Sequence, residues 1–177
     1  MDKHIVVAGA GIVGLATAYE LARRGCRVTV VDKEPAVASH QSGKNSGVIH
    51  SGLYYTPGSL KATFAVAGAQ SMMTFARAHG VDAERTGKLV VATRDDQLPA
   101  LEELRRRGEA NGVPCRMISA AEAREIEPAV NTVGALWVES TGIIDYRGVC
   151  EVLADEVRRR GGEVTLKVAV QSVRRLS

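Results

Sequence analysis

The hydrophobic pattern of the first 31 residues changes from a continuous run to a helical period and back again. Ile-Val-Val-Ala at 5–8 is a short, mainly β-branched run, typical of a buried strand. At 12–24 apolar residues recur every three or four positions, which predicts an amphipathic helix ended by Gly25. A valine-rich run at 27–31 predicts a second strand. Together they predict a right-handed βαβ unit whose two strands are parallel neighbours.

The pattern then breaks down over residues 35–59, which are rich in Ser, Gly, His and Asn. A structureless stretch of this length in a compact domain is usually functional. Pro57 is expected in the first turn of a long helix that reaches about His79 and is stopped by Gly80. Beyond it the pattern predicts strands at 88–93, 133–138 and 163–173, helices at 98–110 and 146–160, and a short helix opened by a capping box at Ser119–Glu122.

Strands that alternate with helices after an initial βαβ unit predict an α/β fold. We expect a Rossmann-like nucleotide-binding domain and the start of a second, mixed domain. The chain has 177 residues, of which 45% are hydrophobic, and this is enough for a real core. Its last predicted strand has nothing after it to cover or extend it, which favours the N-terminal part of a larger protein.

Composition argues against several functional classes. The chain has 23 basic and 20 acidic residues and a net charge of +3, which gives no argument for nucleic-acid binding. Its three cysteines are isolated, without CxxC or Cys/His spacing, so we expect neither a disulfide framework nor a metal site. No apolar run approaches about 18 residues, which argues against a transmembrane segment. A reducing, cytoplasmic compartment is the default expectation.

The residues that open the first helix match the GxGxxG pattern of dinucleotide-binding proteins. Gly9 permits the tight turn, Gly11 lets the backbone approach a pyrophosphate, and Gly14 lets helix and strand pack closely. The phosphates would meet free N–H groups at the helix N-terminus. Asp32, 18 residues after Gly14, is placed to accept hydrogen bonds from the adenosine ribose. The cofactor-binding residues predicted here are Gly9, Gly11, Ile12, Val13, Gly14, Asp32 and Lys33.

The same region resembles the D-amino-acid-oxidase-type superfamily of FAD-dependent oxidoreductases, because the glycine pattern continues at their typical spacing. The positions that carry this likeness are Ala18, Leu21, Gly25, Val28, Val30 and Asp32. The resemblance implies that the cofactor is FAD. The superfamily usually has Glu where this chain has Asp32, whose shorter side chain keeps the charge but must reach one methylene further.

The loop at 42–62 has glycines where a backbone must approach a flat ligand, and Ser, Asn and Lys as donors. Such donors suit flavin carbonyls and pyrophosphate oxygens, and a histidine or lysine near the flavin could stabilise its anionic reduced form. The cofactor-binding residues predicted in this loop are Ser42, Lys44, Asn45, Ser46 and Gly47.

Residues 45–62, NSGVIHSGLYYTPGSLKA, closely resemble a signature of L-2-hydroxyglutarate oxidases and dehydrogenases. Residues 134–138 and 141–146 resemble the return of the same family into its FAD domain. The resemblance implies oxidation of a 2-hydroxy acid, L-2-hydroxyglutarate to 2-oxoglutarate, with FAD taking a hydride from Cα. It also implies an FAD-binding domain at 1–80 that resumes at 141–177 and is truncated there, and the start of a substrate-binding domain at 81–140.

A base must accept the hydroxyl proton as the hydride leaves. His50 is the catalytic candidate, because an imidazole titrates near neutral pH. A contact with the flavin is a competing role for His50, and a core histidine held by backbone atoms is a third. Tyr54, Tyr55 and Lys61 are the candidates for substrate binding, with packing or plain exposure as the alternatives. No arginine stands in a convincing site loop, so the basic clamp that a dicarboxylate normally requires is missing.

The expected partners are a hydroxy-acid substrate and an electron acceptor, either oxygen or a quinone. A quinone acceptor would bring the protein to the inner membrane as a peripheral protein. Two alternatives stay open. The first keeps the flavin but changes the substrate to glycerol 3-phosphate, an amino acid or an amine. The second is a non-catalytic chain that binds at most the ADP portion of a dinucleotide. An NAD-dependent dehydrogenase is less favoured.

Overall fold

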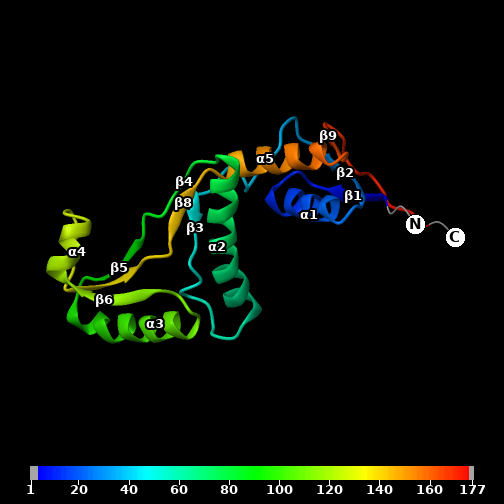
Figure 1. Ribbon diagram of the computed structural model, residues 1–177. Coiled ribbons are helices and arrows are strands. Elements are labelled where there is room, and N and C mark those ends of the chain that lie inside the picture. Colours follow the sequence, from blue (N-terminus) through cyan, green and yellow to red (C-terminus); the bar gives the residue numbers. More distant parts are fainter. Residues whose placement is uncertain (1–3, 176–177) are drawn as a thin grey trace. The chain divides into compact units, whose positions relative to one another are not determined.

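A computed structural model describes residues 4–175, and the chain divides into two compact units (Figure 1). The first unit runs to Gly47 and resumes at Asp145, and the second unit is Val48–Ile144. Each unit combines helices with strands, so the predicted α/β fold is confirmed.

The first unit is a parallel three-stranded sheet with two helices packed against it. β1 (His4–Ala8), α1 (Ile12–Arg23) and β2 (Arg27–Asp32) form the predicted βαβ unit, and β1 and β2 pair in parallel. The chain returns through α5 (Tyr146–Arg159) to β9 (Glu163–Leu166), which pairs in parallel with β2. The strand order is therefore β1-β2-β9, and α1 and α5 lie side by side (Figure 1).

Aliphatic side chains of these elements form the core of the first unit. Leu15 of α1, Val28 of β2 and Val157 of α5 each expose no more than 1% of their surface. Burial of each such side chain contributes roughly 1.5–3 kcal/mol. The start of α5 is fixed by Asp145, whose Oδ1 accepts the Arg147 N–H at 3.0 Å, as expected for a residue that caps a helix.

The second unit is built round an antiparallel sheet with the strand order β5-β7-β6, which contacts α3 and α4. A smaller sheet pairs β3, β8 and β4. The bounds of the elements are β3 (Val48–Ile49), α2 (Leu60–His79), β4 (Ala83–Glu84), β5 (Lys88–Ala92), η1 (Asp95–Gln97), α3 (Leu98–Ala110), β6 (Cys115–Ser119), α4 (Ala120–Ile126), β7 (Gly134–Val138) and β8 (Gly142–Ile144).

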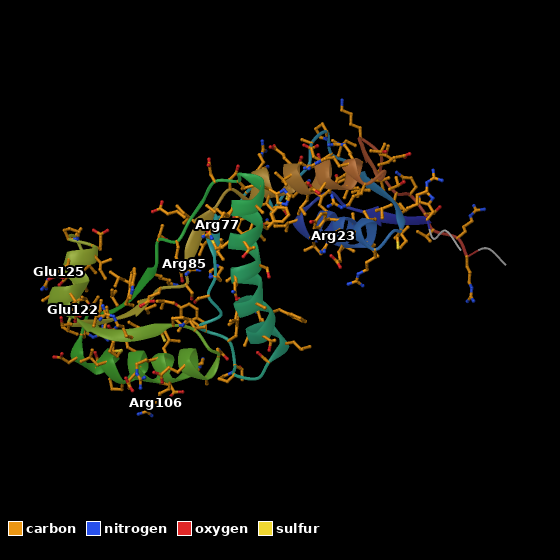
Figure 2. The ribbon with its side chains drawn as sticks, viewed as in Figure 1. Arg23, Arg77, Arg85, Arg106, Glu122 and Glu125 are labelled. Atoms are coloured by element: carbon orange, nitrogen blue, oxygen red, sulfur yellow. The ribbon has the colours of Figure 1, made fainter. Side chains whose placement is uncertain are left out.

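One apolar cluster, the Leu53 cluster, joins the larger sheet to α3 and anchors the loop after β3. Its buried members are Leu53, Ala92, Leu101, Val113, Leu136 and Val138. Because Leu53 is only 2% exposed, the loop that contains the two adjacent tyrosines is fixed by a side chain inside this core. The outer face of α3 carries charged side chains such as Arg106, which points away from the sheet (Figure 2).

Several local predictions are confirmed and two element ends are wrong. The capping box of α4 is present, with the predicted Ser119–Glu122 bonds in both directions. The helix α2 does not begin at Pro57, because Ser59 caps it and accepts the Ala62 N–H at 3.2 Å. The last strand was expected to reach residue 173, but Lys167 adopts a left-handed φ of +61°, and β9 ends before it.

The boundaries of these compact units do not coincide with those of the expected FAD-binding and substrate-binding domains, which stay predictions. The first lies at 47/48 instead of 80/81, and the second at 144/145 instead of 140/141. The helix α2 belongs to the second unit because its Val66 packs against the Leu53 cluster. Among residues 4–175, no helix combines the length and the apolar character that crossing a bilayer requires.

Candidate functional site

The glycine turn between β1 and α1 brings the end of the strand against the start of the helix. Gly9 has a φ of +112°, which side chains rarely tolerate, and its N–H donates to Val31 O at 2.8 Å. A Cβ on Gly14 would lie 2.0 Å from Gly9 O, so only glycine lets the helix approach this closely. The first N–H groups of α1 have no acceptor within the helix, so a side chain from elsewhere in the chain or a ligand must accept from them.

Asp32, at the end of β2, has a carboxylate held by backbone donors. Its Oδ2 accepts the Ala10 N–H at 2.6 Å, and its Oδ1 accepts the Glu34 N–H at 2.8 Å. Partial burial opposes ionisation, but the two hydrogen bonds and the nearby His40 and Lys33 outweigh it and hold the pKa of Asp32 below its usual 3.8. The carboxylate is therefore charged at neutral pH. Its contribution to stability is lost only as the pH falls through that lowered pKa.

The loop after β2 folds back over the glycine turn. The Ala38 N–H donates to Ala10 O at 3.0 Å, and a Cβ on Gly43 would lie 2.2 Å from Ala38 O. Ser42 Oγ accepts the Ile12 N–H at 2.9 Å and so caps α1 from 30 residues away. The long loop is thus ordered by contacts with the turn that it covers.

These elements surround a pocket of about 430 Å³ in the first unit, and its lining includes the predicted Gly9, Gly11, Asp32, Lys33 and Ser42. A Cβ on Gly11 would approach Ser42 Oγ to 3.1 Å, which is closer than an ordinary contact, so the serine side chain would have to shift. A helix N-terminus favours phosphate, and a carboxylate at a strand end accepts from ribose hydroxyls. The donors and acceptors of this pocket therefore fit a dinucleotide.

The lining of this pocket does not include the other predicted cofactor residues, which are Ile12, Val13, Gly14, Lys44, Asn45, Ser46 and Gly47. Val13 is 78% exposed at the start of α1. Asn45 holds its own loop together: its Nδ2 donates to Gln41 O and Ser42 O, each at 2.9 Å, and its Oδ1 accepts the Gly47 N–H at 2.8 Å. The roles of these residues toward a cofactor stay predictions.

The candidates for catalysis and substrate binding lie in the second unit. His50 directly follows β3 and is exposed, which contradicts its interpretation as a core histidine. Tyr54 is 46% exposed, and its hydroxyl accepts a hydrogen bond from Lys88 Nζ at 2.8 Å. Lys61 Nζ lies 4.8 Å from the centroid of the Tyr55 ring. Tyr54 is therefore paired with Lys88, and Tyr55 with Lys61. The sequence analysis singled out Lys61 but not Lys88.

Two further parts of the pocket wall were missed by sequence analysis. The first part is His40, which lies in the loop at 35–59 that the sequence marks as functional. A histidine in such a loop is a signal that could have identified it. Residues 168–170 also line the pocket, and the Val168 N–H donates to Asp32 O at 2.8 Å. Their β-branched composition predicts a continuation of the last strand. Nothing in the sequence predicts the left-handed backbone of Lys167, before which β9 ends.

The chain is similar to curated L-2-hydroxyglutarate dehydrogenases. It is 44% identical over 169 residues to the enzyme of Indibacter alkaliphilus, and the match covers 94% of this chain and 42% of that protein. It is 40% identical over 172 residues to the mitochondrial enzyme of Homo sapiens, covering 96% of this chain and 37% of that protein. The chain spans about two fifths of the length of these relatives.

The solved structure of dithionite-reduced L-α-glycerophosphate oxidase from Mycoplasma pneumoniae, with FAD bound, superposes with a TM-score of 0.86 at 30% identity. The match covers 93% of this chain and 44% of that one. Residues 4–176 also match the protein family described as FAD dependent oxidoreductase, so FAD is the cofactor, as the sequence resemblance implied. Since this match extends over nearly the whole chain, the protein belongs to the FAD-dependent oxidoreductase family.

Proposed function

We propose that the whole protein oxidises L-2-hydroxyglutarate to 2-oxoglutarate. The observation that carries the proposal is the 44% identity with an L-2-hydroxyglutarate dehydrogenase over 94% of this chain. The pocket beside the glycine turn supports the cofactor part independently, because its wall combines a helix N-terminus with a charged strand-end carboxylate.

The first unit is proposed as the FAD-binding domain. The N–H groups that follow Ile12 at the start of α1 would bind the pyrophosphate, together with the Ser42 hydroxyl, whose oxygen accepts the Ile12 N–H and whose proton is left to donate. Asp32 would accept hydrogen bonds from the ribose hydroxyls. Gly11 leaves the space that the pyrophosphate needs. When bound, FAD supplies an acceptor for the hydride that leaves Cα of the substrate.

The second unit is proposed as the start of the substrate-binding domain. His50 would accept the hydroxyl proton on a ring nitrogen as the Cα–H bond breaks, and its exposed side chain is accessible to a substrate. Tyr54, Tyr55 and Lys61 would bind substrate carboxylates, because phenol and ammonium groups donate to anions.

Replacement of Ser42 with alanine should lower both stability and FAD affinity. The variant loses the cap on the Ile12 N–H, which costs about 1 kcal/mol, and also loses a hydroxyl in the pocket wall. Ser59→Ala is the matched control, since it removes the cap of α2 outside this pocket. Urea unfolding should show a similar loss of stability in both variants, but FAD titration should show weaker binding for Ser42→Ala alone. Equal FAD affinity in the two variants contradicts the role of Ser42.

The test of the proposed function is anaerobic mixing of the purified whole protein with candidate substrates. L-2-Hydroxyglutarate should bleach the visible flavin absorption and yield 2-oxoglutarate, whereas D-2-hydroxyglutarate should not. Glycerol 3-phosphate is the second candidate, because a glycerophosphate oxidase superposes at a TM-score of 0.86. Bleaching by glycerol 3-phosphate alone would replace the proposed substrate. A protein that stays colourless after reconstitution with FAD would favour the non-catalytic alternative.

The electron acceptor is proposed to be oxygen or a quinone, and the protein to be cytoplasmic, with peripheral contact with the inner membrane if the acceptor is a quinone. Oxygen consumption and reduction of a soluble quinone analogue, measured with the same substrate, distinguish the two acceptors. Co-sedimentation with membrane vesicles tests the peripheral contact.

A further inference from the structure

We propose that Lys88 and Tyr54 together bind a carboxylate of the substrate, an inference that rests on the proposed function. Lys88 Nζ donates to Tyr54 OH at 2.8 Å and lies 4.6 Å from the centroid of the tyrosine ring. The two residues are 34 positions apart in the sequence and both lie in the second unit. The pair supplies the cationic clamp that a dicarboxylate requires and that no arginine motif provides.

Lys88 occupies an unusual place for a lysine, because it lies on the core side of its strand. Side chains alternate along a strand, so Lys88 shares a face of β5 with Val90 and Ala92. Ala92 is fully buried in the Leu53 cluster and Val90 packs against it. Lys88 itself is half-buried, with its stem at the end of this apolar face and its ammonium directed to Tyr54.

The hydrogen bond between the two side chains leaves several donors for a ligand. An ammonium group has three N–H donors, of which Tyr54 accepts one. The phenol, which accepts from Lys88, keeps its own proton to donate elsewhere. Within residues 4–175 no carboxylate forms an ion pair with Lys88, whereas the exposed Arg106 of α3 pairs with Glu102 at 3.5 Å. A half-buried cation without a counter-ion suits an anion that the ligand brings.

The loop that carries Tyr54 is held in place before any ligand binds. Leu53 fixes one side of it in the core. Asn111, at the end of α3, donates from Nδ2 to Gly52 O at 3.1 Å and to Tyr55 O at 2.8 Å. The backbone on both sides of Tyr54 is therefore bound to the end of α3. Because the loop is already ordered, binding of a ligand costs little conformational entropy.

The test compares Lys88→Met and Tyr54→Phe with the whole wild-type protein. Loss of hydrogen bonds to a charged group should raise the KM for L-2-hydroxyglutarate about 30-fold in Lys88→Met, with kcat changed less than about twofold. Tyr54→Phe should raise this KM by a smaller factor, and the KM of Lys88→Arg should lie between those of the wild type and Lys88→Met. If L-2-hydroxybutanoate, a monocarboxylate, shows no rise in KM, the pair binds the carboxylate distant from the reacting carbon. If the KM rises by a similar factor for both substrates, the pair binds the carboxylate beside the reacting carbon.

Arg116→Met is the control, because it removes a 56% exposed cation from the same sheet and should leave the KM unchanged. Calorimetric titration with glutarate separates this inference from the proposed function, since it requires no turnover. If the wild-type protein does not oxidise L-2-hydroxyglutarate but binds glutarate, and Lys88→Met weakens that binding at least about tenfold, the proposed function fails and the pair stands. If Lys88→Met binds glutarate as the wild type does, or the wild type does not bind it, the pair is refuted.

Discussion

Replacement of His50 with glutamine should slow flavin reduction by L-2-hydroxyglutarate about 10²–10⁴-fold while FAD stays bound. Glutamine retains hydrogen-bonding groups but cannot accept a proton at neutral pH. The pocket beside the glycine turn belongs to the first unit and His50 to the second, so the cofactor contacts of that pocket are unaffected. Anaerobic stopped-flow absorbance measures the rate, and the flavin content of the purified variant measures retention.

The pH profile decides between the two roles left for His50. A base that must be neutral makes the reduction rate of the wild type rise with pH, and His50→Gln should lose this dependence. His4→Gln is the matched control: His4 is exposed on β1, where its Nε2 lies 2.9 Å from Thr29 Oγ1, and its loss should leave the rate unchanged. A retained pH profile with a shifted flavin potential would assign His50 to a flavin contact instead.

Replacement of Gly14 with alanine should destabilise the first unit by about 3 kcal/mol and abolish FAD retention. The added Cβ would lie 2.0 Å from Gly9 O and 3.5 Å from Val7 Cγ1. Backbone atoms cannot give way as a flexible side chain does, so α1 must move away from β1 and carry its N-terminus out of place. The midpoint of urea unfolding and the FAD content of the purified whole protein measure the two effects.

Gly68→Ala is the matched control for this variant. Gly68 lies inside α2, and a Cβ there would meet nothing within 4 Å. The same substitution should therefore stabilise the protein by about 0.5–1 kcal/mol, because alanine favours a helix more than glycine does. If Gly14→Ala has the same urea midpoint and the same FAD content as Gly68→Ala, the close packing at the turn is contradicted.

Local sequence patterns predicted the βαβ unit well because its determinants are neighbours in the chain. The period of the apolar residues marks α1, the left-handed Gly25 ends it, and Asp32 follows 18 residues after Gly14. The same holds for α4, whose capping box lies within four residues. In each case the atoms that interact are close together in the sequence.

Features that depend on distant partners were not predictable in this way. The strands β3, β4 and β8 are two or three residues long, and each pairs with a segment far along the chain. The boundary at 47/48 follows from the packing of α2 on the Leu53 cluster, which no local pattern reveals. The local pattern predicts only a strand at Lys88, because its partner Tyr54 lies 34 residues earlier in the sequence.

Asn111 is the C-cap residue directly after α3, and its side chain donates to two carbonyl groups of the loop that contains Tyr54. Helix ends fray more readily than sheets melt, and such fraying usually has no effect on distant residues. Because Asn111 holds the loop, loosening of the helix end on warming should release the loop while the larger sheet is still intact. The proposed substrate contacts of Tyr54 should therefore weaken at temperatures below that of global unfolding.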